Sequence, residues 1–253
     1  PAGAVGSIAP WVTTVAAGTH DRVLTRTLRL GDGAILTGTG QGATALPSAR
    51  VVDAVAGAAV PADAELCKAG SLNRSAVAGA IVLCKRGVNG RTDKSRTVRD
   101  AGGVGMVLYN DPDSTLDVDF HAVPTVHLNR ADGLRVKAYA ATAGATARLD
   151  AAVRGRTRAP AVAATSSAGP ARIPSGPLLK PDLLAPGVSV LAATAAAGVP
   201  TFGVRSGSSV AAAQVSGAGA LLLGRTPTLS PTAVRSRSTR LPRPRAAARP
   251  SRK

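Results

Sequence analysis

Short apolar runs, separated by glycine, proline and polar residues, make up most of the chain. Runs of about four to eight apolar residues bounded by turn signals are typical of buried strands. This pattern predicts strands at residues 11–17, 80–84, 105–109, 123–128 and 188–193. Between residues 22 and 38 the apolar positions alternate around Gly31-Asp32-Gly33, which predicts a β-hairpin.

Two stretches in the middle of the chain have helical patterns. Residues 93–101 begin at Asp93, a candidate N-cap, and end before Gly102-Gly103, since glycine readily adopts the left-handed conformation that stops a helix. Residues 131–141 form the second predicted helix. These helices and the neighbouring strands predict a self-contained α/β unit over residues 46–150.

A third helical stretch begins after Gly207, where Ser208 and Ser209 run directly into small and aliphatic residues. Its small side chains make this helix narrow enough to be buried. A hydroxyl at a helix start lies beside unpaired N–H groups, which stabilise the negative charge that develops in acyl transfer. Ser209 is therefore a candidate nucleophile, and a serine N-cap on a small-residue core helix is the alternative that the same residues allow.

The order of residues restricts the chemistry open to Ser209. A serine nucleophile needs a general base, usually His, and a carboxylate that orients it. The forty-four residues after Ser209 contain no His, Asp or Glu. This excludes the arrangement in which acid and histidine follow the serine, so both partners must come earlier in the chain.

Charge and composition add two constraints. Only five residues are aromatic, so the core must consist mainly of Ala, Val and Leu. Such side chains suit tightly packed α/β layers. Residues 235–253 hold seven Arg and one Lys and no acid, supply +8 of the net charge of +17, and are predicted to be a disordered tail. A nucleic-acid-binding arm and an unselected or out-of-frame terminus are both compatible with this tail, and the second is favoured.

Membrane insertion is not expected. The longest apolar run, residues 210–224, is interrupted by Gln214 and is too short for a bilayer core of about 30 Å. The chain opens at Pro1 with neither Met nor a secretory signal, so we expect it to be a piece of something longer.

No cofactor and no metal site is predicted. A G-x-G-x-x-A match at residues 38–43 lacks the following helix of a dinucleotide site, and the acidic residues of 111–119 lack the Gly and Glu of a calcium loop. We expect 111–119 to be a solvated acidic loop. The potential zinc ligands do not have zinc-site spacing; they are Cys67, Cys84, His121 and His127. The two cysteines, with sixteen residues between them, allow either a disulfide in an oxidising compartment or two buried thiols.

Four segments, in order, resemble the subtilisin-like serine proteases. Residues 207–217 are similar to the serine motif of that family, with Ser209 at the nucleophile position. Residues 180–187, 163–170 and 9–17 resemble three further family segments. Between them, residues such as 77–87, 101–110 and 121–128 are similar to the protease-associated domain inserted in many secreted members.

The resemblance implies an α/β fold: a partial subtilisin-like parallel sheet with helices, interrupted by a protease-associated domain of mixed strands and helices. It divides the chain into residues 1–45 (catalytic domain), 46–150 (protease-associated domain), 151–234 (catalytic domain with the serine motif) and 235–253 (basic tail). We expect 46–150 to be the stable unit and the flanks to be loosely ordered.

The resemblance also assigns roles. Ser209 matches the nucleophile, and its own N–H would form half of the oxyanion hole. The aspartate, histidine and oxyanion asparagine of the family match positions before Pro1, and none of His20, His121 and His127 matches the base. Within the motif, Ser208, Val210 and Ala213-Gln214 depart from the residues usual in the family.

The expected function is therefore that of a fragment of a secreted serine endopeptidase, which hydrolyses peptide or protein substrates through an acyl-enzyme. Alone, the chain is expected to be inactive, because base and asparagine are missing. The alternative is a non-catalytic peptide- or protein-binding module built on the protease-associated domain, with nucleic-acid binding by the tail as a remoter one.

Overall fold

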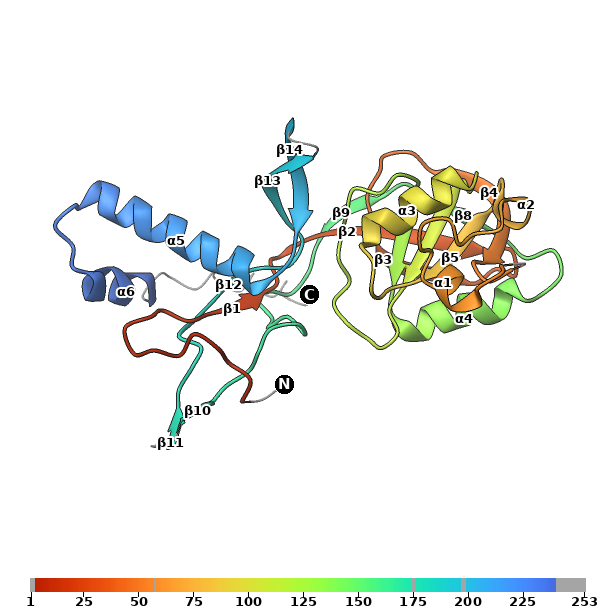
Figure 1. The fold of residues 1–253 in the computed structure, drawn as a ribbon. Helices are drawn as coiled ribbons and strands as arrows, with labels where there is room; N and C mark the ends of the chain where they lie inside the picture. The colour runs from red at the N-terminus through yellow and green to blue at the C-terminus, as the bar shows by residue number, and fades with distance from the viewer. Residues whose placement is uncertain (1–2, 57, 174–175, 197–198, 240–253) are drawn as a thin grey trace, which may run out of the picture.

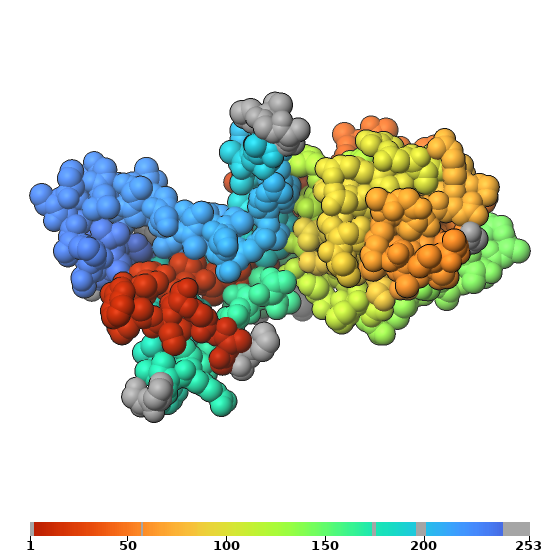
Figure 2. Space-filling model, in the orientation of Figure 1, coloured from red at the N-terminus to blue at the C-terminus, as the bar shows by residue number. Residues whose placement is uncertain are grey.

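The computed structural model describes residues 3–56, 58–173, 176–196 and 199–239, which form two units of unequal size (Figure 1). The larger unit is built on one sheet and lies in the orange, yellow and green part of the chain. The smaller unit combines the first residues with those after about residue 160, including the blue helices α5 (Ser208–Arg225) and α6 (Pro231–Thr239). Figure 2 shows the larger unit as a compact mass and the smaller unit as a more open one.

The sheet of the larger unit has eight strands in the order β3-β7-β6-β5-β4-β8-β2-β9, and an additional β2–β3 pairing closes seven of them into a ring. Pairing is parallel from β4 through β7 and antiparallel elsewhere. The strands are β2 (Arg22–Leu30), β3 (Ile35–Thr39), β4 (Leu46–Asp53), β5 (Ile81–Lys85), β6 (Gly105–Tyr109), β7 (Thr125–Leu128), β8 (Thr146–Leu149) and β9 (Val153–Arg156). The helices are α1 (Pro61–Glu65), α2 (Arg74–Val77), α3 (Arg91–Asp100) and α4 (Arg130–Ala140).

Two apolar clusters hold this unit together, one on each face of the parallel strands. Along β6, Val107 belongs to the cluster that α4 covers, whereas Met106 and Leu108 belong to the cluster that α3 covers. Both faces are buried, which is why these strands appear in the sequence as continuous apolar runs. Cys67 and Cys84 form a disulfide in the second cluster, with their Cα atoms 5.7 Å apart, which settles the alternative that the sequence leaves open.

Several local predictions for this unit are confirmed, and two are not. The strands and the 22–38 hairpin form, but α3 begins at Arg91 with Gly90 as N-cap, so Asp93 lies in the first turn, where its charge suits the helix dipole. The prediction of a solvated acidic loop at 111–119 is wrong for Asp117 and Asp119, which are 1% and 8% exposed. Arginine side chains accompany both carboxylates into the interior.

The smaller unit is built on two parallel strands, β1 (Val15–Gly18) and β12 (Leu183–Pro186), with α5 packed against them. In the described residues of this unit, the parallel pairing is limited to this two-stranded sheet, and the larger subtilisin-like sheet stays a prediction. Two hairpins project from it, β10 (Ala171–Ile173) with β11 (Gly176–Leu178) and β13 (Val190–Ala196) with β14 (Val199–Arg205) (Figure 1). Its core is small, consisting of Ala17, Ala163, Ala185, Val188 and Ala211.

Helix α5 is mostly exposed, contrary to the expectation of a buried serine helix. Only Ala211 and Gly219 of its residues are buried, while Leu221 is 79% exposed. The strands β1 and β12 cover one side of the helix, and α6 contacts another part of it. No helix in the described part of the chain is long and apolar enough to cross a membrane.

The boundaries of the units differ from those drawn on the sequence. Strands β2, β3 and β9 lie outside residues 46–150, yet they belong to the sheet of the larger unit. Residues 235–239, assigned to the disordered tail, are helical because they complete α6. The rest of the expected tail, residues 240–253, lies outside the described residues.

The candidate active-site serine and its surroundings

Ser209 occupies the first turn of α5, directly after a glycine whose conformation sets the start of the helix. Gly207 is the N-cap residue and has φ of 155°, a value that favours glycine. Its N–H donates to the carbonyl oxygen of Gly187 at 2.7 Å. A Cβ atom on Gly187 would lie 2.8 Å from both the Cβ atom of Ala17 and the oxygen of Gly207, so β1, the turn after β12 and the helix start meet where only glycine fits.

The surroundings of Ser209 suit the binding of negative charge. The side chain is exposed and forms no hydrogen bond with any described residue. No side chain caps α5, and the N–H groups of Ser208 and Ser209 donate to no acceptor in the described part of the chain. Unpaired N–H groups at the positive end of a helix dipole favour an anion or a developing oxyanion beside them.

None of the three histidines forms a hydrogen bond with Ser209 in the described part of the chain. His20 Nε2 lies 3.3 Å from the carbonyl oxygen of Ser189. His127 is buried between Asn110, whose Oδ1 is 2.8 Å from Nε2, and the N–H of Asp117, 3.2 Å from Nδ1. Burial lowers the pKa of His127 to about 4, so the ring is neutral at pH 7, with Nε2 donating and Nδ1 accepting.

His121 is no base for Ser209 either. It belongs to the loop before β7, and its Nδ1 atom is buried without a hydrogen-bond partner among the described residues. Burial lowers its pKa to about 4, against the opposing effect of the Asp119 charge. Ser209 therefore lies exposed at a helix start and has no histidine bonded to it in the described chain.

The base of the β13–β14 hairpin contacts the larger unit through two serines, Ser189 before β13 and Ser206 after β14. Ser206 Oγ donates to Asp117 Oδ1 at 2.6 Å and accepts from the N–H of Ser189 at 2.9 Å. Ser189 Oγ accepts in turn from the N–H of Val118 at 3.0 Å. We call these four residues, Asp117, Val118, Ser189 and Ser206, the serine clasp. It joins the base of the β13–β14 hairpin to the loop between β6 and β7.

Asp117 is held from the side of the larger unit by two arginines. Its Oδ2 atom lies 3.2 Å from Arg86 Nη2 and 3.2 Å from Arg91 Nη1, and Arg91 also pairs with Asp119. Burial lowers the pKa of Arg86, whereas for Arg91 the bonds to Asp119 outweigh burial and raise the pKa. Two arginines and two aspartates thus form a balanced, largely buried charge cluster.

A second polar cluster, around Lys180 and Asp182, lies within the smaller unit. Lys180, 4% exposed, donates to Asp182 Oδ2 at 2.6 Å and to the carbonyl oxygen of Val12 at 2.8 Å. Burial would raise the pKa of Asp182, but the bonds from Lys180, the N–H of Thr14 and Arg235 hold it below its ordinary value. The lysine and aspartate that the sequence places before the serine motif therefore fix strand β12 to the N-terminal segment.

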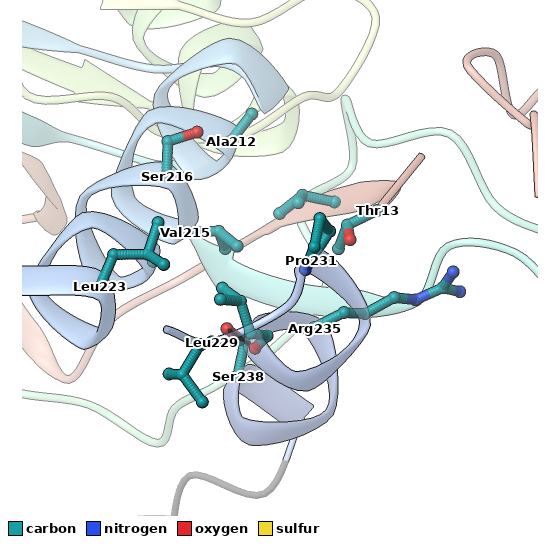
Figure 3. A pocket seen from close by; sticks show the side chains of 12 residues that line it. Thr13, Ala212, Val215, Ser216, Leu223, Leu229, Pro231, Arg235 and Ser238 are labelled. Carbon is teal, nitrogen blue, oxygen red and sulfur yellow. Dashed lines mark hydrogen bonds between the residues drawn. The ribbon is translucent and has the colours of Figure 1, made fainter. Parts of the chain in front are cut away.

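A groove of about 440 Å³ lies between α5, α6 and the start of β1. Figure 3 shows the side chains that line it. Ala212, Val215 and Leu223 line it from α5, Pro231 and Arg235 from α6. Ser209 is not among the lining residues, so this groove is not a substrate pocket around the serine. In the described part of the chain no group of three or more His, Cys, Asp or Glu side chains is arranged to hold a metal ion.

Sequence comparisons define the class of the larger unit first. Residues 48–136 match the PA domain, the protease-associated domain. Nearly the whole chain is similar to subtilisin-like proteases of Arabidopsis thaliana. It is 37% identical to subtilisin-like protease SBT1.2 over 252 residues, and 39% identical to SBT5.3 over 256 residues. Each alignment covers 92% of this chain, and 32% or 33% of the relative.

The chain is thus related to the subtilisin-like proteases that carry a PA domain, and it spans about a third of the length of these relatives. Among solved structures, the zinc aminopeptidase BSAP from Bacillus subtilis is 18% identical, with a TM-score of 0.37 over 55% of this chain and 32% of that one. This likeness is too slight to support an argument.

The sequence predicts Ser209 as a candidate site residue but does not predict the serine clasp. Ser189 and Ser206 are small polar residues at the ends of strands, where serine is common. Nothing in the sequence therefore distinguishes them from other loop serines. Asp117 stood out only as one of several acidic residues. Its partners come from segments far apart in the chain, so no local pattern marks it.

Proposed function

We propose that this chain is part of a secreted subtilisin-like serine endopeptidase, that Ser209 is its nucleophile, and that the chain by itself does not hydrolyse peptides. The observation that carries the proposal is the placement of Ser209 at the start of α5, exposed and beside unpaired N–H groups, without a histidine partner. The relatives' names supply the class of reaction.

In the complete active site, Ser209 Oγ attacks the carbonyl carbon of a peptide bond while a histidine outside this chain takes the hydroxyl proton. The tetrahedral intermediate places its oxyanion beside the N–H of Ser209 and the positive end of the α5 dipole. The histidine returns the proton to the leaving amine, and water then hydrolyses the acyl-enzyme. This chain supplies the nucleophile and one oxyanion donor.

Secretion is part of the proposal. The Cys67–Cys84 disulfide supports it, since structural disulfides persist in oxidising compartments. A peptide or protein is the expected substrate, and no nucleic acid, membrane or cofactor is required for the reaction.

A second candidate function is a non-catalytic binding module centred on the PA domain. The larger unit favours it, because two complete apolar clusters and a disulfide stabilise this unit, whereas the smaller unit has a core of five residues. Binding of peptides by the chain that is unchanged in Ser209→Ala, together with an upstream reading frame without Asp and His motifs, would favour this function.

Labelling with a fluorophosphonate, which reacts with activated serines, tests the main proposal. The chain alone should label no faster than its Ser209→Ala variant. A chimera, in which the chain replaces the matching third of SBT1.2, should label rapidly and lose the label in Ser209→Ala. Stoichiometric, Ser209-dependent labelling of the chain alone would refute its inactivity. A folded chimera that labels equally well without Ser209 would refute the role of the serine.

A further inference from the structure

The serine clasp is a direct hydrogen-bonded connection from the PA domain to the segment that carries Ser209. Ser206 lies three positions before Ser209 and two before the start of α5. Its hydroxyl bonds to a carboxylate of the PA domain on one side and to the N–H of Ser189 on the other. The clasp therefore fixes both sides of the hairpin base from which α5 emerges.

Asp117 is suited to this task because it cannot readily move. Its side chain is buried, and its Oδ2 atom lies at ion-pair distance, 3.2 Å, from Arg86 and Arg91 without a hydrogen bond among the described residues. The Oδ1 atom accepts the hydrogen bond from Ser206. Its backbone is held as well, since its carbonyl oxygen accepts from Thr39 Oγ1 at 3.1 Å and its N–H meets His127. A hydrogen bond to an ionised acceptor is stronger than one between neutral groups.

The smaller unit, in contrast, offers little to fix the helix start. α5 buries only Ala211 near its N-terminus, has no side-chain cap, and follows a glycine. The segment before Ser208 is held by the pairing of Arg205 with Val190, by the Gly207–Gly187 hydrogen bond and by Ser206. Of these three restraints, the one through Ser206 leads to the PA domain.

We infer that Asp117 of the PA domain, acting through Ser206, is a positioning residue for Ser209: the inserted domain sets the placement of the nucleophile. The inference rests on the proposed function of Ser209, but the contact itself does not. A misplacement of a reacting group by about 1 Å can lower a rate by about a hundredfold, so a tether three residues away is close enough to matter.

Ser206→Ala is the best variant, because it removes the hydroxyl and leaves the arginine pairs of Asp117 in place. In the chain alone, hydrogen exchange should accelerate roughly tenfold at the amides of Ser189 and Val118, which the clasp protects. Ser206→Thr, which keeps a hydroxyl, should restore protection. Ser216→Ala, an exposed serine of α5 ten positions after Ser206 in the sequence, is the matched control and should change neither amide. If the amides of Ser189 and Val118 stay as protected in Ser206→Ala as in the wild type, the inferred role of the Ser206 hydroxyl is wrong.

The chimera then tests the effect on the nucleophile. Ser206→Ala should lower the fluorophosphonate labelling rate and kcat roughly tenfold or more with little change in KM, and Ser206→Thr should recover both. Faster exchange at Ser189 with an unchanged labelling rate would overturn the positioning role. Labelling that survives Ser209→Ala would instead overturn the proposed function, so the two failures are distinguishable.

Discussion

The guanidinium of Arg235 lies 2.6 Å from the carboxylate of Asp182, so α6 is fastened to the segment that leads into β12. Arg235 also donates to the carbonyl oxygen of Pro10 at 2.9 Å. This arginine is the first residue of the predicted basic tail, yet it has specific partners. The helix that contains it covers one end of the groove in Figure 3.

Replacing Arg235 by Met should loosen α6. The ion pair is partly exposed, so we expect a loss of no more than about 1 kcal/mol in local stability, while Asp182 keeps its bond to Lys180. Faster hydrogen exchange at the Val234 amide measures the effect. Arg237→Met, on the same helix and without an ion pair in the described chain, should leave that amide unchanged. Equal effects of both variants would contradict a specific role for Arg235.

The Cys67–Cys84 disulfide should be a main source of stability of the PA domain. A bridge that closes a loop of this size contributes about 3 kcal/mol to the free energy of unfolding. The double variant Cys67→Ala/Cys84→Ala should lose that amount in urea unfolding, and the reduced wild-type chain should behave similarly. A double variant as stable as the oxidised chain would show that the bridge is dispensable.

Gly187→Ala should disturb the helix start from a distance. The added Cβ would lie 2.8 Å from both the Cβ atom of Ala17 and the oxygen of Gly207. The turn after β12 would have to move away from β1 and the start of α5, which lowers the free energy of unfolding by about 1–3 kcal/mol. Hydrogen exchange in peptides from β1 and the first turn of α5 should accelerate. Gly217→Ala is the matched control: no atom lies within 4 Å of its added Cβ, and it should stabilise α5 by up to about 1 kcal/mol. Protection in Gly187→Ala at the wild-type level would contradict the close packing.

The free energy of unfolding should fall as the pH drops from about 6.5 to about 4. Burial lowers the pKa of His121 and of His127 to about 4, whereas a histidine in the unfolded chain has a pKa of about 6.5. Between these values the unfolded chain binds more protons, so acid favours unfolding, by up to about 1.4 kcal/mol per pH unit for each histidine. Above pH 6.5 the contribution is complete and constant.

Urea unfolding at pH 7.5, 6 and 5 measures this dependence. His127→Gln retains a donor for Asn110 and an acceptor for Asp117. It should reduce the dependence of the free energy of unfolding on pH by about the contribution of one histidine. A stability that does not change between pH 7.5 and 5 would contradict the burial of neutral rings.

The elements of the PA domain follow from the sequence because its parallel strands are buried on both faces and appear as continuous apolar runs. The extent of its sheet does not follow, since β2 pairs with β8 and β9, more than one hundred residues further along the chain. The helix start at Ser209 could be predicted from its local motif, and its role as nucleophile stays a prediction. The burial of Asp117 could not be found in that way, because Arg86 and Arg91 reach it from other elements.

The central claim is that Ser209 is the nucleophile, and the site of covalent modification tests it most directly. The chimera with SBT1.2, treated with fluorophosphonate and digested, should carry one phosphonyl adduct, on Ser209, as mapped by mass spectrometry. Ser208→Ala should retain the adduct and Ser209→Ala should lose it. An adduct on Ser208, Ser206 or any other residue of a folded chimera would contradict the account.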